Sequence, residues 1–273
     1  LGKTADYEMF MKRAENYKNV MDVSTGFARP KNTNGKWLTP FDPTFIGHGD
    51  DRHYTEANAW QYTWFVPQDV QGLINIEGGR KRFVEKLDSL FTISSAIKET
   101  VSDATGLIGQ YAHGNEPSHH TIYLYDYAGA PWKTQNMVRR VMDELYSDGP
   151  AGLCGNEDMG QMSAWYVLSL MGFYPVAPGQ NVWVVGSPEF SKVTLHLDKS
   201  FNKATEFVIE ARNNSIENKY IQSAILNGKT MSKTWFGEDV IQNGGKLIFD
   251  MGPEPNKNWG SAPDSAPPSM TKK

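Results

Sequence analysis

Three segments of the sequence gather acidic and amide side chains among aromatic residues, each where a loop leads into a predicted helix. They are residues 54–64 (YTEANAWQYTW), 113–120 (HGNEPSHH) and 152–161 (GLCGNEDMGQ). Carboxyl groups held in different protonation states can perform general acid and general base chemistry. Acidic groups also stabilise a helix N-terminus by about 0.3–1 kcal/mol each, so a purely structural role for every one of them is the alternative.

Glu56 has the surroundings of a general acid. Trp60 and Trp64 follow it at i+4 and i+8, so a helix that begins near residue 56 would place the three side chains on one face. A carboxyl group packed against large rings is desolvated, which raises its pKa and suits it to donate a proton. A glutamate at a helix N-terminus with no catalytic part would show the same pattern.

A second acidic cluster, formed by Asn156, Glu157 and Asp158, stands between two glycines and directly before a predicted helix. A carboxylate with several hydrogen-bond donors around it stays ionised, as a general base requires. An acidic cap of the following helix would use the same residues. The cluster by itself therefore leaves a base and a helix cap as open alternatives.

Glu116, His119 and His120 raise the question of a metal ion. The H-E-x-x-H spacing of zinc-binding helices is absent from the sequence. Glu116 with backbone carbonyl groups would suit calcium, a hard cation that takes oxygen ligands. Adjacent histidines point in different directions on a helix, so we expect one to meet a substrate and the other to lie in the core. The single cysteine, Cys154, is interpreted as a small buried loop thiol.

Helices that position these segments are predicted by apolar residues at helical spacing. The predicted stretches are 4–21, 56–66, 68–76 with 79–91, 119–129, 132–147 and 159–172. Thr4 is a suitable N-cap residue for the first of them. The last is apolar nearly all round, which predicts a buried helix that ends at Gly172.

Short segments of alternating polarity follow residue 175 and predict strands over 182–185, 192–197, 206–211, 220–226 and 246–251. Asn227 and Gly228 form a strong hairpin signal. The predicted fold is mainly α, with a helical region over residues 1–175 and a small antiparallel β-domain over 176–260. The tail, residues 261–273, is rich in Pro, Ser and Ala and is expected to be flexible.

Composition narrows the class of protein. The 273 residues are 39% hydrophobic and carry a net charge of −4, which argues against disorder and against general nucleic-acid binding. No apolar run is long enough to span a membrane. Eight tryptophans form either an aromatic core or a surface that packs on sugars. The long segment 26–54, with its prolines and glycines, reads as a functional loop.

The three segments, taken in order, resemble glycoside hydrolase family 92, the calcium-dependent inverting exo-α-mannosidases. The resemblance rests on YTEANAWQYTWFVPQD (54–69), GNEPSHH (114–120), GNEDMGQMSAWY (155–166) and MGPEPNK (251–257) with Trp259 and Gly260. It implies a β-sandwich, an (α/α)6 toroid and a small β-region. The sequence holds about half of the toroid's helices, so the chain is expected to be a C-terminal fragment whose partner is the missing N-terminal part.

The resemblance also implies roles for individual residues. Glu56 matches the general acid and Asp158 the general base, with carboxyl groups ~6.5–9.5 Å apart for inversion. Asn156, where many relatives carry Asp, would orient the base or the water, and Glu157 is the fallback base. Expected substrate-binding residues are Trp60, Trp64, Asn115, Glu116, His119 and His120, with Asn58, Gln61 and Asp50 as further candidates. Glu116 is the candidate ligand of the Ca²⁺ cofactor.

The expected activity is that of an exo-α-mannosidase, of α-1,2 linkage, acting on N-glycans or mannans. Mannose-containing glycans are the expected partners, and their nature favours an extracellular or periplasmic enzyme. The isolated fragment is expected to be inactive. The alternative is a non-catalytic carbohydrate-binding or assembly module, because an incomplete toroid would leave no complete sugar site.

Overall fold

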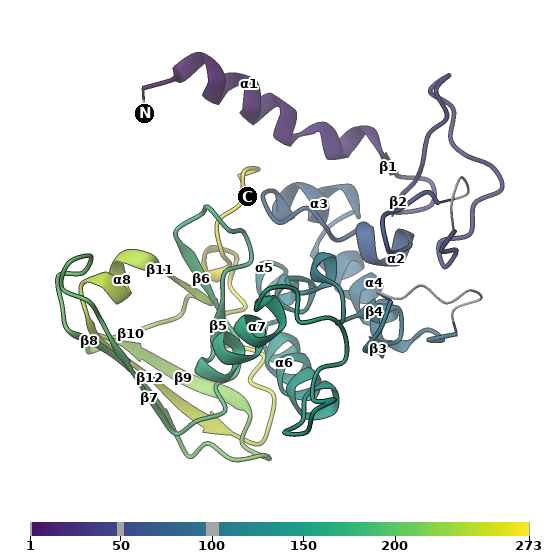
Figure 1. Ribbon diagram of the computed structural model, residues 1–273. Coiled ribbons are helices and arrows are strands. Elements are labelled where there is room, and N and C mark those ends of the chain that lie inside the picture. The colour runs from purple at the N-terminus through teal and green to yellow at the C-terminus, as the bar shows by residue number, and fades with distance from the viewer. Residues whose placement is uncertain (1, 48–51, 97–103, 273) are drawn as a thin grey trace. The chain divides into compact units, whose positions relative to one another are not determined.

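The computed structural model describes residues 2–47, 52–96 and 104–272. Contacts between Cα atoms divide the chain into two compact units, Leu1–Ser118 with Ser269–Lys272 and His119–Pro268 (Figure 1). This division lies before the boundary that the sequence suggests at residue 175, because the helices after Ser118 contact the strands that follow them. The domain limits drawn from the sequence stay predictions.

The first unit holds four α-helices among its described residues: α1 (Thr4–Ala14), α2 (Ala59–Tyr62), α3 (Val70–Ile76) and α4 (Arg80–Thr92). Its short strands pair as β1 (Met21–Asp22) with β2 (Phe27–Ala28) and β3 (Leu107–Ile108) with β4 (Tyr111–Ala112). Its described residues also include the 3₁₀ helices Asn16–Asn19 and Glu116–Ser118. The predicted helix 4–21 thus ends early, and Thr4 is its first residue rather than its cap.

Helix α4 carries the apolar stripe that the sequence predicts. Phe83, Leu87, Leu90 and Phe91 are all buried along one face. Each such side chain contributes about 1.5–3 kcal/mol when it leaves water. Trp64 meets Phe83 edge to face, with ring centroids 5.3 Å apart, and extends this core.

Buried Asp69 binds the end of the tail that the sequence suggests is flexible. Its carboxylate accepts hydrogen bonds from the Ser269 hydroxyl at 3.0 Å and from the Thr271 amide and hydroxyl at 2.8 and 2.9 Å. The same carboxylate accepts one from the Tyr17 hydroxyl at 2.9 Å and caps α3 through the Gly72 amide. One buried anion therefore joins three distant parts of the first unit.

The second unit begins with helices and continues with strands. Its helices are α5 (Leu124–Tyr127), α6 (Pro131–Leu145), α7 (Gln161–Met171), α8 (Glu238–Gln242) and the 3₁₀ helices Thr121–Tyr123 and Pro263–Ser265. The predicted stripe of α6 is confirmed, since Met137, Val138, Val141 and Met142 are buried. The prediction that α7 is buried all round is wrong: only one face is covered, and Val167 on another is 51% exposed.

Two sheets form the β-region (Figure 1). The larger has the order β10-β9-β12-β8-β7 and the smaller β11-β6-β5. Their strands are β5 (Phe173–Tyr174), β6 (Val182–Val185), β7 (Lys192–His196), β8 (Glu206–Arg212), β9 (Tyr220–Leu226), β10 (Lys229–Thr230), β11 (Trp235–Gly237) and β12 (Gly245–Gly252). Asn227 and Gly228 form the tight turn between β9 and β10, both with positive φ.

The expectation of a purely antiparallel β-domain needs one correction. Strand β12 lies between β8 and β9, antiparallel to β9 but parallel to β8. Strands β8 and β9 are consecutive in the chain but are not paired with each other, and β12 lies between them. Leu247 and Phe249 of β12 are fully buried. The mainly α chain with a C-terminal β-region is confirmed, and the toroid stays a prediction. None of the helices in the described ranges has the length and apolarity to cross a membrane.

Candidate functional site

Glu56 and Asp158 share a rare backbone conformation. Their φ angles are 58° and 49°, in the left-handed region, and Met159 follows with 57°. In the described parts of the chain, the other non-glycine residues of this kind are Asn213 and Asn227, a residue type that tolerates it. Such a conformation costs of order 1–3 kcal/mol and persists only where surrounding contacts impose it, as at active sites.

The acid loop, residues 54–58, leads into α2 rather than belonging to it. Asn58 is the N-cap of α2, so the predicted helix 56–66 shrinks to Ala59–Tyr62. Glu56 consequently lies in a loop, and the prediction that it shares a helix face with Trp60 and Trp64 is wrong. The Tyr54 hydroxyl fixes the start of the loop by donating to the Ala28 carbonyl at 2.6 Å.

A buried amide lies directly behind Glu56. The Nδ2 group of Asn115 donates to the Glu56 carbonyl at 3.3 Å, while the Oδ1 atom of Asn115 accepts from the Glu116 amide at 3.1 Å. Beside the loop, burial raises the pKa of Tyr62 above its ordinary value, and the charge of Glu56 raises it further, although a hydrogen bond from Thr55 opposes this. Tyr62 is therefore a neutral phenol near the Glu56 carboxyl group.

Four side chains that were predicted to bind sugar are almost completely buried. Trp64, Asn115, His119 and His120 are all 5% exposed or less. They are buried in this conformation, and their expected contact with a sugar stays a prediction. Trp60 is half-buried and packs edge-on against Phe27, with ring centroids 4.8 Å apart, and Glu116 is also half-buried. Asp50 lies outside the described residues.

The base loop, residues 156–160, precedes α7. Asp158, Met159 and Gly160 have positive φ in succession, and Asp158 is exposed. Glu157 turns back onto the helix, where its carboxylate accepts from the Ser163 amide at 3.1 Å and from the Ser163 hydroxyl at 2.9 Å. Glu157 therefore caps α7, while Asp158 projects from the strained turn that this cap helps to hold.

His119 is tied to the start of α7. Its Nδ1 atom accepts from the Gln161 amide at 3.0 Å, since an amide nitrogen can only donate, and its carbonyl accepts from the Trp165 indole at 3.0 Å. The second unit thus brings His119 and the base loop to the same helix end. Cys154 is half-buried, and burial raises the pKa of its thiol, which disfavours the thiolate that a nucleophile would need.

A calcium site built from ionisable ligands is not found in the ranges that the structure describes. These ranges hold no group of three His, Cys, Asp or Glu side chains placed to share a metal ion. Near Glu116, the Oδ1 atom of Asn115 is already engaged by a backbone amide. A calcium ion would also draw on backbone carbonyl, amide and water oxygens, so Glu116 stays a predicted ligand.

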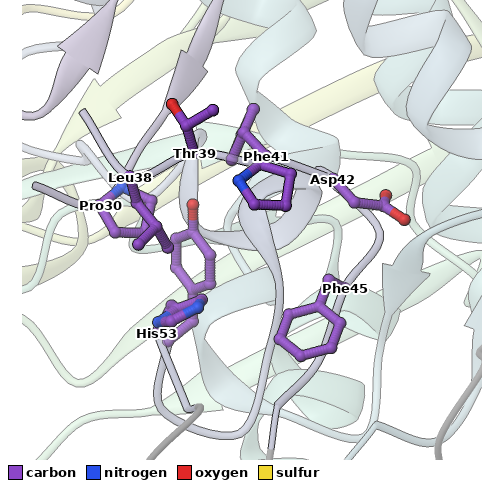
Figure 2. Close-up of a pocket in the computed structure, with 9 residues that line it drawn as sticks. Pro30, Leu38, Thr39, Phe41, Asp42, Phe45 and His53 are labelled. Carbon is purple, nitrogen blue, oxygen red and sulfur yellow. The ribbon is translucent and has the colours of Figure 1, made fainter.

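A cavity of about 390 Å³ lies in the first unit beside the acid loop (Figure 2). Its walls come from the long segment that the sequence marked as functional and from the loop itself: Pro30, Leu38, Thr39, Pro40, Phe41, Asp42, Phe45, His53 and Tyr54. Apolar and aromatic faces of this kind suit the C–H face of a sugar ring. Tyr54 lines the cavity two positions before Glu56 in the chain.

Two supporting residues escaped the sequence analysis or were given another role there. Gln110 is fully buried and bonds to Asn58 and Gln61, although nothing in its local sequence sets it apart. Asn115 was expected to bind substrate, and its side chain donates to the Glu56 carbonyl. Glu56 and Asp158 belong to different units of the chain.

Comparisons with known proteins agree on one family. The family model "Glycosyl hydrolase family 92 catalytic domain" matches residues 1–253. An uncharacterized secreted glycosidase of Arthroderma benhamiae is 31% identical over 290 residues, covering 99% of this chain and 35% of the relative.

Solved structures give the same result. A family GH92 α-mannosidase of Bacteroides thetaiotaomicron in complex with mannoimidazole has a TM-score of 0.91 and 39% identity, covering 99% of this chain and 36% of that chain. A family GH92 inverting mannosidase of the same species has a TM-score of 0.86 and 40% identity, covering 99% and 37%. The chain therefore spans about a third of the length of these relatives.

Proposed function

This chain belongs to glycosyl hydrolase family 92, and we propose that it contributes the general acid and the general base of an inverting α-mannosidase. The observation that carries the proposal is the left-handed backbone at both Glu56 and Asp158. Strain of this kind is retained where function needs a side chain in an otherwise unfavourable place. Glu56 was selected by its surroundings and Asp158 by the family resemblance, and the strain that they share supports a catalytic role for both.

The proposed reaction is a single displacement. Glu56 donates its proton to the glycosidic oxygen as the bond from that oxygen to the anomeric carbon breaks. Asp158 accepts a proton from a water molecule that attacks the anomeric carbon from the opposite face. Carboxyl groups about 6.5–9.5 Å apart leave room for this water. Asn156, beside the base, is proposed to orient the water or the Asp158 carboxylate.

Glu157 is the less favoured base in this proposal. Its two carboxylate oxygens are both engaged by Ser163. Asp158 is exposed, and no hydrogen bond joins its carboxylate to another residue of the described ranges. A carboxylate that must take a proton from water needs such an open oxygen.

Calcium remains the proposed cofactor, with Glu116 as the proposed ligand from this chain. The proposed substrate is an α-1,2-linked mannose at the end of an N-glycan or a mannan. Secretion, or export to a periplasm, is proposed from this substrate class and from a fungal relative that is named a secreted glycosidase. Because the chain spans about a third of its relatives, turnover is proposed for the whole protein and not for the chain alone.

The test uses the full-length protein with α-1,2-mannobiose and proton NMR of the first product formed. We expect β-mannose first, and a fall in kcat of about 10²–10⁴ for Glu56→Gln and Asp158→Asn. Glu144→Gln and Asp143→Asn, at exposed positions of α6, are matched controls that should leave kcat unchanged. Retained activity in Glu56→Gln, or α-mannose as the first product, would reject the proposal.

A non-catalytic sugar-binding module is the second candidate, favoured by one observation: the two acids lie in separate units of a chain that spans a third of its relatives. Calorimetric titration of the chain with mannose separates the two. Saturable binding, together with a full-length protein that shows no turnover, would support the module. Turnover by the full-length protein that depends on Glu56 would exclude it.

A further inference from the structure

We propose that Asn58, Gln61, Gln110 and Asn115 form a positioning network, the amide network, that holds the backbone of Glu56 for proton donation. This inference rests on the proposed role of Glu56 as the general acid. None of the four side chains carries a charge, and all are buried. They act on Glu56 through its main chain and through the loop around it, not by contact with substrate.

Asn58 and Gln61 close the acid loop onto α2. The Gln61 amide N–H donates to Oδ1 of Asn58 at 3.3 Å, and the Asn58 N–H donates to Oε1 of Gln61 at 3.0 Å. This reciprocal capping box fixes the residue two positions after Glu56. Asn58 is fully buried, so its side chain must find partners within the protein.

Gln110 supplies those partners from a distant part of the sequence. Its Oε1 atom accepts from Nδ2 of Asn58 at 2.8 Å, and its carbonyl accepts from Nε2 of Gln61 at 3.1 Å. Its own Nε2 donates to the Ser94 carbonyl at 2.7 Å, and its N–H donates to Leu90 at 2.8 Å. The acid loop is thereby anchored to the end of helix α4.

Asn115 completes the network at the main chain of Glu56 itself. It follows strand β4, whereas Gln110 lies in the turn between β3 and β4, so one hairpin delivers both amides. Nδ2 of Asn115 donates to the carbonyl of Glu56 itself, at 3.3 Å. Glu56 has a left-handed φ of 58°, and this contact at its carbonyl, together with the capping box two residues later, holds the backbone on its C-terminal side.

A general acid must place its proton within hydrogen-bond reach of the leaving oxygen. Misplacement by about 1 Å can lower a rate about 100-fold. Loss of the amide network should therefore slow the reaction most when the leaving group needs protonation. The rate should change little for a substrate whose leaving group departs as a stable anion, because that group needs no proton.

The experiment measures kcat/KM of the full-length protein on α-mannosides that differ only in the leaving group: methyl for a poor one, 2,4-dinitrophenyl for a good one. The variants are Asn115→Leu and Gln110→Met, which remove the amide and keep the approximate shape. Asn34→Ala, at an exposed loop position of the same unit, is the control. Glu56→Gln serves as the reference for loss of the acid.

We expect both network variants to lose about 10–100-fold on the methyl mannoside and less than about threefold on the dinitrophenyl mannoside, as for a misplaced acid. The control should change on neither substrate. Equal losses on the two substrates would mean a general structural role and overturn the inference, as would no loss on either. If Gln110→Met fails to fold, Asn115→Leu alone decides between these outcomes.

The two proposals fail in different ways. If Glu56→Gln itself shows no dependence on the leaving group, the proposed function fails, whatever the network variants do. If Glu56→Gln shows the dependence and Asn115→Leu does not, the acid assignment stands and the amide network is rejected.

Discussion

The carboxylate of Glu157 holds Ser163 at two points, accepting from its backbone amide at 3.1 Å and from its hydroxyl at 2.9 Å. The amide belongs to the first turn of α7, where backbone N–H groups have no partner within the helix. The sequence pattern left a base and a helix cap open for the cluster 156–158. The structure gives the cap to Glu157 and leaves Asp158 exposed.

Separate substitutions of these two acids should therefore give different phenotypes. For Glu157→Ala we expect a loss of about 0.5–2 kcal/mol in the free energy of unfolding, as for other helix caps. For Asp158→Ala we expect little change in stability but a loss of about 10²–10⁴ in kcat. Urea unfolding measures the stability of each variant, and kinetics of the full-length protein measure its kcat. A larger loss of kcat in Glu157→Ala than in Asp158→Ala would reverse the assignment.

The hydrogen bonds around Asp69 predict a loss of stability in acid. Burial by itself would raise the pKa of Asp69, but hydrogen bonds from Thr271, Tyr17 and Ser269 outweigh it and hold the pKa below its ordinary value. A lowered pKa in the folded state contributes stability above the unfolded pKa, which is about 3.9. That stability is lost as the pH falls through the folded pKa.

For Asp69→Asn we therefore expect a loss of about 1.5–3 kcal/mol at pH 7, the range for hydrogen bonds to a charged group. The difference from the wild type should shrink below about pH 4, where the unfolded carboxyl group is protonated. Urea unfolding at pH 7 and pH 3 measures it. Asp239→Asn, at an exposed position of α8, is the control. A difference that stays constant with pH would contradict the prediction.

Arg139 of α6 is predicted to be essential for the stability of the second unit. It is buried, forms an ion pair with Glu189 at 2.7 Å, and donates to Ser187 at 3.1 Å and to Asn214 at 2.6 Å. Because Arg139→Met leaves these groups without their partner, we expect a loss of about 3–5 kcal/mol. The neighbouring Arg140 has only an exposed pair with Glu144, so Arg140→Met should cost less than about 1 kcal/mol. Thermal unfolding measures both variants, and similar losses of stability for Arg139→Met and Arg140→Met would contradict this prediction.

Removal of divalent cations tests the proposed calcium cofactor. We expect dialysis of the full-length protein against a chelator to abolish turnover of α-1,2-mannobiose and to lower its melting temperature, because a bound ion stabilises the folded state. Added Ca²⁺ should restore both, whereas Mg²⁺, which requires a tighter octahedral site, should not. Glu116→Gln should weaken Ca²⁺ binding in a calorimetric titration, with Glu144→Gln as control. Full activity after chelation would reject calcium.

Local sequence pattern was sufficient to predict much of the secondary structure of this protein. The stripes of α4 and α6, the strands of the β-region and the turn at Asn227–Gly228 depend on residues close together in the chain, so their periodicity was sufficient to predict them. Glu56 was singled out by its aromatic neighbours, whereas the choice of Asp158 over Glu157 came from the family resemblance. The resemblance carried by their motifs agrees with the family model.

Tertiary structure alone decided how those residues are held. Gln110 reaches the acid loop from the β3–β4 turn, Asp69 binds Thr271 near the other end of the chain, and β12 enters the sheet parallel to β8. Each of these contacts joins segments far apart in sequence, and local propensity says nothing about such partners. Buried amides and carboxylates must be satisfied somewhere, but which distant group satisfies them is fixed only when the chain packs.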